Sequence, residues 1–195
     1  MITGHVFIAT SLDGYIARKD GQIDWLGCID TSNEDHGYDQ FINQIDAIVM
    51  GSGTFETLSH ITPWVYNLPV VVLSSTLTNQ AVPEHLVGKV RFSDQSPENV
   101  MKMLELEGCQ HVYIDGGQLV QSFLKRGMIS DLIITKLPIL LGSGRPLFGD
   151  LNHDILLNHL HTRSFPSGFV QSKYEVLKWK IKSLAARQLT SKLSL

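Results

Sequence analysis

Short apolar runs of four to six residues recur along this chain, separated by stretches long enough for a helix or a turn. Runs that are rich in valine and isoleucine and do not alternate with polar residues are typical of strands buried on both faces, as in a parallel sheet covered by helices. This feature restricts the chain to an α/β architecture. The predicted strands are Val6–Thr10, Ala47–Met50, Val70–Ser74, Lys89–Phe92, His111–Asp115 and Leu132–Lys136.

Helical spacing of apolar residues predicts three helices between these strands. One carries Asp35, Tyr38, Ile42 and Ile45 on a shared face, one starts at Ser96-Pro97, and one covers Leu119–Arg126 and ends at Gly127.

The last part of the chain has a different pattern. Leu157–Phe165 and Phe169–Leu177 are joined by Pro166-Ser167-Gly168, which predicts an antiparallel hairpin. The expected fold is a single α/β domain over residues 1–176, with a mixed, mostly parallel sheet and a C-terminal antiparallel hairpin. Residues 177–195 form a basic C-terminal extension.

Charge is divided unevenly along the 195 residues, although the formal net charge is only −3. Residues 171–195 contain six Lys or Arg against one Glu and carry +5, so residues 1–170 carry −8. An acidic body argues against nucleic acid as a partner, because phosphate binding needs a basic face. No signal peptide and no apolar run long enough to cross a membrane is recognised. Cys28 and Cys109 form no disulfide framework, so we expect a soluble, cytoplasmic protein.

Three glycine-containing loops follow predicted strands: Met50-Gly51-Ser52-Gly53-Thr54-Phe55-Glu56, Ile114-Asp115-Gly116-Gly117-Gln118 and Leu141-Gly142-Ser143-Gly144-Arg145-Pro146-Leu147-Phe148. The first two run into predicted helices. Glycine lets backbone N–H groups approach a phosphate, and a helix N-terminus favours an anion. Two such junctions at one sheet edge could hold the two phosphates of a dinucleotide. The alternative is that these glycines only make tight turns, and neither the Rossmann fingerprint nor the P-loop motif is present.

Hydroxyl groups follow another strand, in the segment Ser74-Ser75-Thr76. Hydroxyls at the carboxyl end of a strand can donate hydrogen bonds to a phosphate or a ribose. A solvated turn is the simpler interpretation of this segment taken alone.

Taken together and in order, these segments resemble the dihydrofolate reductase superfamily, in particular the C-terminal reductase domain of the bacterial riboflavin deaminase/reductase and its stand-alone relatives. The resemblance spans about residues 4 to 176. The segments that carry it are Ile8-Ala9-Thr10-Ser11-Leu12-Asp13-Gly14-Tyr15-Ile16-Ala17, Met50-Gly51-Ser52-Gly53-Thr54-Phe55-Glu56, Val72-Leu73-Ser74-Ser75, Ile114-Asp115-Gly116-Gly117 and Leu140-Leu141-Gly142-Ser143-Gly144 followed by Leu147-Phe148.

The resemblance implies a three-layer fold that binds NADPH at its strand ends. It implies that backbone groups of Ala9 and Ile16 hold the nicotinamide carboxamide. It assigns the pyrophosphate to Gly53-Thr54 and Gly116-Gly117, and the 2′-phosphate to Ser74 and Ser75 with Arg91 nearby. The full implied cofactor-binding set is Ala9, Ile16, Gly51, Ser52, Gly53, Thr54, Ser74, Ser75, Gly116, Gly117, Gln118 and Leu119.

Two positions depart from the dihydrofolate reductases themselves. Ser52 stands where those enzymes usually carry a phosphate-binding Arg, which leaves the choice between NADPH and NADH open. Leu68 stands where an Arg clamps the folate carboxylate, and leucine cannot replace a bidentate Arg–carboxylate pair. We therefore expect an NADPH-dependent reductase of a small heterocyclic or ribosylated, pyrimidine- or pterin-like substrate, similar to the riboflavin-pathway reductase. The alternatives are a nucleotide-binding sensor or interaction protein without turnover, and a dihydrofolate reductase proper.

Hydride transfer to a C=N or C=O bond requires a proton, which a buried carboxyl group can supply. Asp35 is the first candidate, because it shares a helix face with Tyr38, and Glu34 is the second. The alternative is that both lie at a solvated helix start, since Thr31 and Glu34 have the spacing of a capping box.

Three further features complete the sequence-based expectations. Arg18, Lys19 and Arg145 stand near the pocket loops, where they could hold a phosphorylated substrate or be solvated charges. His159 and His161 alternate on one face of the predicted hairpin, and no metal site is expected from them. The extension of residues 177–195 is a candidate contact in a homodimer.

Overall fold

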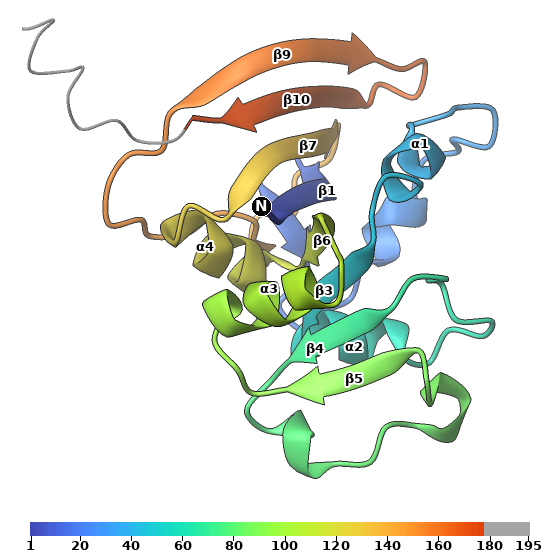
Figure 1. The fold of residues 1–195 in the computed structure, drawn as a ribbon. Coiled ribbons are helices and arrows are strands. Elements are labelled where there is room, and N and C mark those ends of the chain that lie inside the picture. Colours follow the sequence, from blue (N-terminus) through green and yellow to red (C-terminus); the bar gives the residue numbers. More distant parts are fainter. Residues whose placement is uncertain (178–195) are drawn as a thin grey trace, which may run out of the picture.

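A computed structural model describes residues 1–177 of the chain (Figure 1). Residues 178–195, and with them the predicted role of the basic extension, lie outside the described residues. The order of elements is β1 (Thr3–Ser11), β2 (Tyr15–Ala17), α1 (Tyr38–Ile42), β3 (Ala47–Gly51), α2 (Ser52–Leu58), β4 (Val70–Leu73), β5 (Val90–Ser93), α3 (Pro97–Leu106), β6 (His111–Asp115), α4 (Gly117–Lys125), β7 (Ile129–Leu137), β8 (Arg145–Pro146), β9 (Leu157–Ser164) and β10 (Val170–Val176).

The main sheet has eight strands in the order β5-β4-β3-β6-β1-β7-β10-β9. The strands from β5 to β7 pair in parallel, whereas β10 is antiparallel to both β7 and β9. The predicted mixed, mostly parallel sheet with a C-terminal hairpin is therefore confirmed, and all eight predicted strands are present. A further two-stranded sheet, in which β2 pairs with β8, was not predicted.

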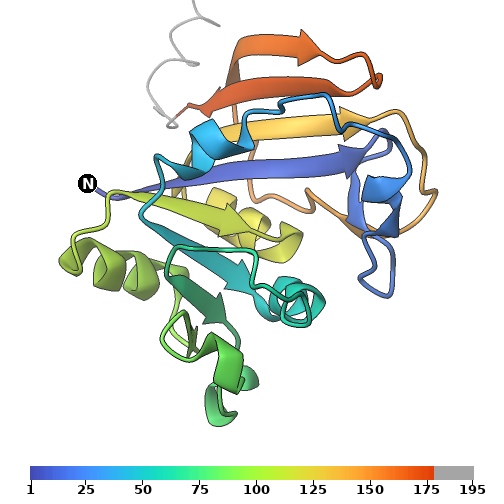
Figure 2. The same ribbon diagram turned by 90° about the vertical axis from the view of Figure 1, so that its right-hand side faces the viewer.

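Helices cover both faces of the sheet, which makes three layers (Figures 1 and 2). On one face α3 and α4 pack on β1, β6 and β7 through fully buried residues such as Leu104, Val120 and Phe123. On the other face Phe41 of α1 and Phe55 of α2 pack against the central strands. Two sequence signals for helix ends are confirmed: the Ser96 side chain caps α3, and Gly127 after α4 has a left-handed φ of 65°.

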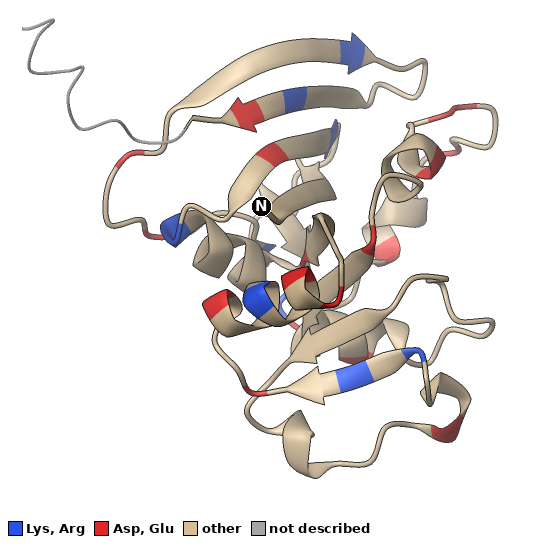
Figure 3. Ribbon diagram, in the orientation of Figure 1, with Lys and Arg blue, Asp and Glu red and all other residues tan. Residues whose placement is uncertain are grey.

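The helix predicted around Asp35 is shorter than its pattern suggests. It begins at Tyr38, so Asp35 precedes it in a loop. Gly37 is the reason, because its φ of 77° is a left-handed conformation that a helix interior does not contain. Figure 3 shows the Lys and Arg residues of the described part of the chain on separate elements, interspersed with Asp and Glu.

The strand β9 contains a bulge that the alternation pattern did not predict. His161 pairs with Lys173, whereas His159 pairs with Tyr174, so Leu160 is an extra residue in the ladder. The prediction that His159 and His161 share a face is therefore wrong. Among residues 1–177, no group of three or more His, Cys, Asp or Glu side chains is arranged to hold a metal ion.

Candidate functional site

The carboxyl ends of the parallel strands lie at one edge of the sheet, which is where α/β proteins bind ligands. Ser11 ends β1, Gly51 ends β3, Leu73 ends β4 and Asp115 ends β6. Met50 and Asp115 are direct register partners in β3 and β6. The predicted glycine loops thus emerge from neighbouring strands at the same edge.

The loops after β3 and β6 are in contact. A Cβ atom at Gly116 would lie 2.6 Å from the side-chain oxygen of Thr54, and Gly116 has a φ of 94°, so a side chain is excluded on two grounds. Within residues 1–177, no side chain caps the start of α2 or α4. The predicted pyrophosphate residues are therefore close together, with the first N–H groups of both helices uncapped.

Ile16 lies against the same loops. A Cβ at Gly117 would lie 3.0 Å from Cδ1 of Ile16 and 2.6 Å from the carbonyl oxygen of Pro146. The small sheet explains this contact, because Tyr15 in β2 pairs with Pro146 in β8. Two segments of the family resemblance, far apart in sequence, thus form one wall beside the loop after β6.

Ala9 lies in β1 beneath a small aromatic cluster. It packs against a core formed by Trp25, Leu137, Phe165 and Phe169. Trp25 is fully buried, and its indole N–H has no hydrogen-bond partner among the described residues. The hydroxyl of Thr10, the next residue after Ala9, is also buried and has no hydrogen-bond partner among the described residues. Unsatisfied buried polar groups are rare in native proteins, and the indole N–H of Trp25, in the same cluster as Ala9, is therefore a candidate donor to a polar ligand group.

Ser74 and Ser75 follow β4, as expected, but they differ in whether the hydroxyl is already used in hydrogen bonds within the turn. The Ser74 hydroxyl accepts hydrogen bonds from the N–H groups of Thr76 and Leu77, so it stabilises the turn. Ser75 is exposed. Arg91 lies on β5, the strand that pairs with β4, and its guanidinium forms two hydrogen bonds, of 2.8 and 2.6 Å, with the carboxylate of Glu107.

Of the remaining predicted cofactor residues, Gly51 and Ser52 join β3 to α2, and both are half-buried. Gln118 and Leu119 lie in the first turn of α4, where Gln118 is exposed and Leu119 packs on the core. These four residues therefore belong to the same two loop-to-helix junctions as Gly53 and Gly116.

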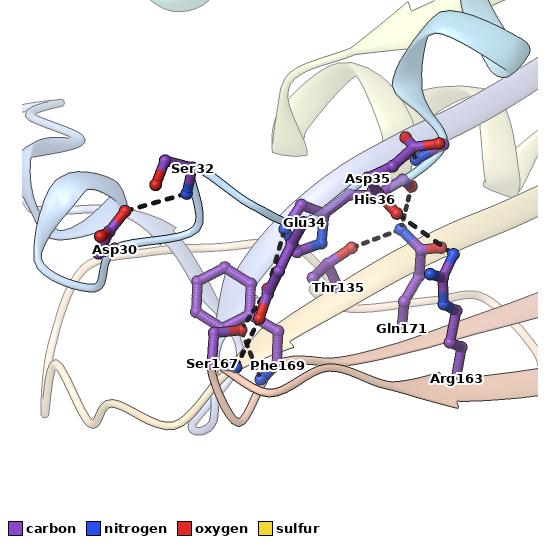
Figure 4. Close-up of polar contacts among 11 residues, drawn as sticks. Asp30, Ser32, Glu34, Asp35, His36, Thr135, Arg163, Ser167, Phe169 and Gln171 are labelled. Carbon is purple, nitrogen blue, oxygen red and sulfur yellow. Dashed lines mark hydrogen bonds and ion pairs between the residues drawn. The ribbon is translucent and has the colours of Figure 1, made fainter.

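The prediction that Asp35 shares a helix face with Tyr38 is wrong, because Asp35 precedes α1. Asp35 is exposed, and its carboxylate accepts a 2.7 Å hydrogen bond from the N–H of Gly37 in the loop before α1 (Figure 4). Its backbone carbonyl accepts a hydrogen bond from Arg163 of β9. The alternative interpretation of a solvated carboxylate before a helix describes Asp35 correctly.

Glu34 is bound to the turn of the hairpin. One carboxylate oxygen accepts a 2.6 Å hydrogen bond from the Ser167 N–H, and the other accepts one of 2.7 Å from the Ser167 hydroxyl (Figure 4). Its side chain is 9% exposed. His36 is held too, since the side-chain amide of Gln171 donates hydrogen bonds to the His36 carbonyl and to the Thr135 hydroxyl. Residues 34–36 are thus fastened along the hairpin.

A carboxylate that the sequence analysis did not select, Asp115, is buried at the end of β6. It accepts a 3.2 Å hydrogen bond from the Tyr66 hydroxyl. Tyr113, two residues earlier on the same strand face, donates a 2.8 Å hydrogen bond to the Phe7 carbonyl. Tyr38 of α1 packs edge-on against the Phe7 ring. The signal that could have identified Asp115 is an acidic residue that ends an apolar strand directly before two glycines.

Burial raises the pKa of Asp115, although hydrogen bonds, above all that from Tyr66, act in the opposite direction. Burial, followed by the charge of Asp115, also raises the pKa of Tyr38 to about 12. Asp115 therefore keeps its proton to a higher pH than an ordinary aspartate. A carboxyl group with this property at a strand end is a candidate general acid.

Comparison with known protein families assigns the chain to one family. The model of the RibD C-terminal domain matches residues 3–171. The chain belongs to this family. The resemblance predicted from the sequence is thereby confirmed, and a reductase is supported at the level of the family.

Relatives cover most of the chain. YwjB of Bacillus subtilis (strain 168), an uncharacterized protein, is 33% identical over 162 residues, which is 82% of this chain and 90% of YwjB. YyaP from the same organism, also uncharacterized, is 31% identical over 183 residues and covers 86% of this chain. These relatives establish the family but add no activity.

Solved structures agree with the fold. A Shewanella sp. PV-4 protein proposed to act in riboflavin biosynthesis is 37% identical, with a TM-score of 0.84 over 91% of this chain and all of that one. The Thermotoga maritima diaminohydroxyphosphoribosylaminopyrimidine deaminase/5-amino-6-(5-phosphoribosylamino)uracil reductase is 16% identical, with a TM-score of 0.69. This chain covers 90% of its own length but 57% of the Thermotoga protein, so that likeness concerns the fold of one part.

The residues present fit a nicotinamide dinucleotide. The helix starts beside Gly53 and Gly116 have no side-chain cap within residues 1–177, and the buried indole N–H of Trp25, in the same cluster as Ala9, has no partner there either. No helix among the described residues is long and apolar enough to span a membrane.

Proposed function

We propose that this protein is an NADPH-dependent reductase of a small heterocyclic or ribosylated substrate with a pyrimidine- or pterin-like ring. The contact between the loops after β3 and β6, at Thr54 and Gly116, is the observation that carries the proposal. It joins two uncapped helix starts at the edge where the ends of β3 and β6 meet. Such an arrangement suits the two phosphates of a dinucleotide.

In this proposal the cofactor supplies a hydride when it is bound. The backbone groups of Ala9 and Ile16 hold the nicotinamide carboxamide, and the loops at Gly53 and Gly116 hold the pyrophosphate. Ser75, which is exposed after β4, is the hydroxyl available for the 2′-phosphate. The aromatic cluster around Trp25 excludes water from the nicotinamide side.

Asp115 is the residue that we propose as the proton donor. Its burial favours the protonated carboxyl group, and Tyr66 fixes one of its oxygens through a 3.2 Å hydrogen bond. It replaces Asp35, which is exposed, and Glu34, whose two oxygens are occupied by Ser167. Glu34 and Asp35 instead hold the segment before α1 against the hairpin of β9 and β10.

Binding and turnover test the proposal separately. NADPH and NADH are each titrated against the full chain, with thermal shift and cofactor fluorescence as readouts, and oxidation of NADPH is then followed with pterins, deaminated ribosylaminopyrimidines and small carbonyl compounds. We expect binding of NADPH and its oxidation with at least one ring substrate. If neither cofactor shifts the melting temperature, the proposal is wrong. Binding without oxidation across the panel favours a nucleotide-binding sensor.

Folate provides the test against a dihydrofolate reductase proper. Leu68 offers no charge for the folate carboxylate, so we expect dihydrofolate to bind poorly and to be turned over slowly. Efficient reduction of dihydrofolate would contradict this part of the proposal.

A further inference from the structure

The guanidinium of Arg145 lies against two glycines that belong to other loops. A Cβ at Gly53 would lie 2.9 Å from its Nη1 atom, and a Cβ at Gly21 would lie 3.1 Å from its Nη2 atom. A larger residue at either position would displace the guanidinium. Within residues 1–177, this guanidinium has no hydrogen bond or ion pair. Arg145 is thus a cation packed on glycine backbone and open to a ligand.

The backbone around Arg145 is held from three sides. The ladder between β2 and β8 pairs Arg145 with Ala17. The carboxylate of Asp13 accepts hydrogen bonds from two N–H groups a few residues before it. The side-chain amide of Gln121, from α4, donates to two carbonyls directly after it. Since the loop is anchored on both sides of Arg145, the backbone that carries this exposed side chain is held in place before any ligand binds.

The neighbouring basic residue Arg18 is different. Its guanidinium forms hydrogen bonds of 2.6 and 2.9 Å with both carboxylate oxygens of Asp24, so its charge is already paired. Of these two arginines near the pocket loops, Arg145 is the one available to an anion.

Arg145 and Gly53 line a common hollow of about 330 Å³. His60 also lines this hollow, and Asp20 and Glu56 contribute carboxylates, so the hollow is not basic as a whole. Anion binding there depends on the planar guanidinium, which can donate two parallel hydrogen bonds to phosphate oxygens. On its other side, Pro146 touches Gly117, so the guanidinium belongs to a loop that bridges the ends of β3 and β6.

We propose that Arg145 binds the pyrophosphate of the nicotinamide dinucleotide. The inference rests on the proposed function and adds to it the cation that Ser52 cannot provide. Its position beside Gly53 and next to the loop of Gly117 assigns it to the pyrophosphate rather than to the 2′-phosphate, for which Ser75 lies on the next strand, β4.

The test measures dissociation constants of NADPH and NADH by cofactor fluorescence for the full chain, Arg145→Gln, Arg145→Lys and the matched control Arg18→Gln. We expect Arg145→Gln to weaken both cofactors by a similar factor of about tenfold to a hundredfold, which is typical of losing a charge-assisted pair. Arg145→Lys should recover part of the loss, because the charge is kept and the bidentate geometry is not. Arg18→Gln should stay within about threefold, as for an exposed pair.

The outcomes separate the inference from the function it rests on. If the unaltered chain binds neither cofactor, the proposed function fails. If it binds them and Arg145→Gln binds equally well, the inference alone is overturned. Weakening of NADPH without NADH would assign Arg145 to the 2′-phosphate and also overturn it. Melting temperatures of the unliganded variants show that the fold is intact, and Arg145→Lys decides the matter if Arg145→Gln is unstable.

Discussion

The carboxylate of Asp13 accepts a 2.7 Å hydrogen bond from the backbone N–H of Gly142, which lies 129 residues later in the chain. Its other oxygen accepts hydrogen bonds from the Leu141 N–H and the Ser11 hydroxyl. One side chain therefore joins the loop after β1 to the loop after β7. This contact explains why two segments that carry the family resemblance, although far apart in sequence, belong to one structural unit.

Replacing Asp13 with alanine should loosen the loop that carries Arg145. We expect faster amide hydrogen exchange in residues 139–148 and severalfold weaker binding of NADPH, because the backbone that carries Arg145 is no longer held in advance. The matched control is Asp94→Ala, which removes an exposed carboxylate in the loop after β5. Unchanged exchange in 139–148 would show that β2 and β8 hold the loop without Asp13.

The same contact predicts a pH dependence. The hydrogen bond from Ser11, followed by those from the Gly142 and Leu141 N–H groups, holds the pKa of Asp13 below its usual value. A lowered folded-state pKa means that the stabilisation is present above the unfolded-state pKa and is lost as the pH falls through the folded-state value. The difference in melting temperature between the unaltered chain and Asp13→Ala should therefore shrink in acid. A constant difference down to strongly acidic pH would contradict this reasoning.

Glu34 should prove structural. Glu34→Ala leaves the N–H of Ser167 without its acceptor, and we expect a loss of about 1–3 kcal/mol in the free energy of unfolding. Asp35→Ala removes an exposed carboxylate and should cost less. Urea unfolding measures both variants, and Ser167→Ala with its double mutant gives the coupling energy. Full stability of Glu34→Ala together with lost turnover would instead support the catalytic role first considered for Glu34.

The sheet was predictable from the sequence because its central strands are continuous apolar runs, such as Val70–Leu73, whose character does not depend on distant residues. The glycine loops were also predictable, because their motifs are short and likewise do not depend on distant residues. What the sequence could not indicate depends on tertiary contacts. Asp35 lies outside α1 because Gly37 has a left-handed conformation. Asp115 could not be selected from the sequence because its environment depends on a hydrogen bond from Tyr66, which lies 49 residues earlier in the chain. The availability of Arg145 likewise depends on contacts with distant glycines.

Asp115→Asn should separate chemistry from binding. We expect turnover to fall by about 10²- to 10⁴-fold, as for the loss of a general acid, while the dissociation constant of NADPH stays the same. Since the protonated form is the active one, the rate of the unaltered chain should fall as the pH rises through the raised pKa. Because the folded-state pKa of Asp115 is raised above the unfolded-state value, the unaltered chain also loses folding stability as the pH rises through that pKa. Asp115→Asn should therefore be the more stable protein at high pH.

Tyr66→Phe provides the companion test of this assignment. Its hydroxyl favours the charged form of Asp115, so its removal should raise the pKa of Asp115 further and move the alkaline limb of the rate profile to higher pH. A limb that moves to lower pH, or that persists in Asp115→Asn, would exclude Asp115 as the group that titrates.

Ser75 should decide the preference between the two cofactors. Ser75→Asp places a negative charge at the exposed position after β4 that we assign to the 2′-phosphate, where it repels NADPH and leaves NADH unaffected. We expect the ratio of the two dissociation constants to change by at least about tenfold, equivalent to about 1.4 kcal/mol. Asn79→Asp adds the same charge at an exposed position later in the same loop and serves as the control. An equal effect of both substitutions would mean that the 2′-phosphate does not contact Ser75 and that the charge acts only through the general field of the loop.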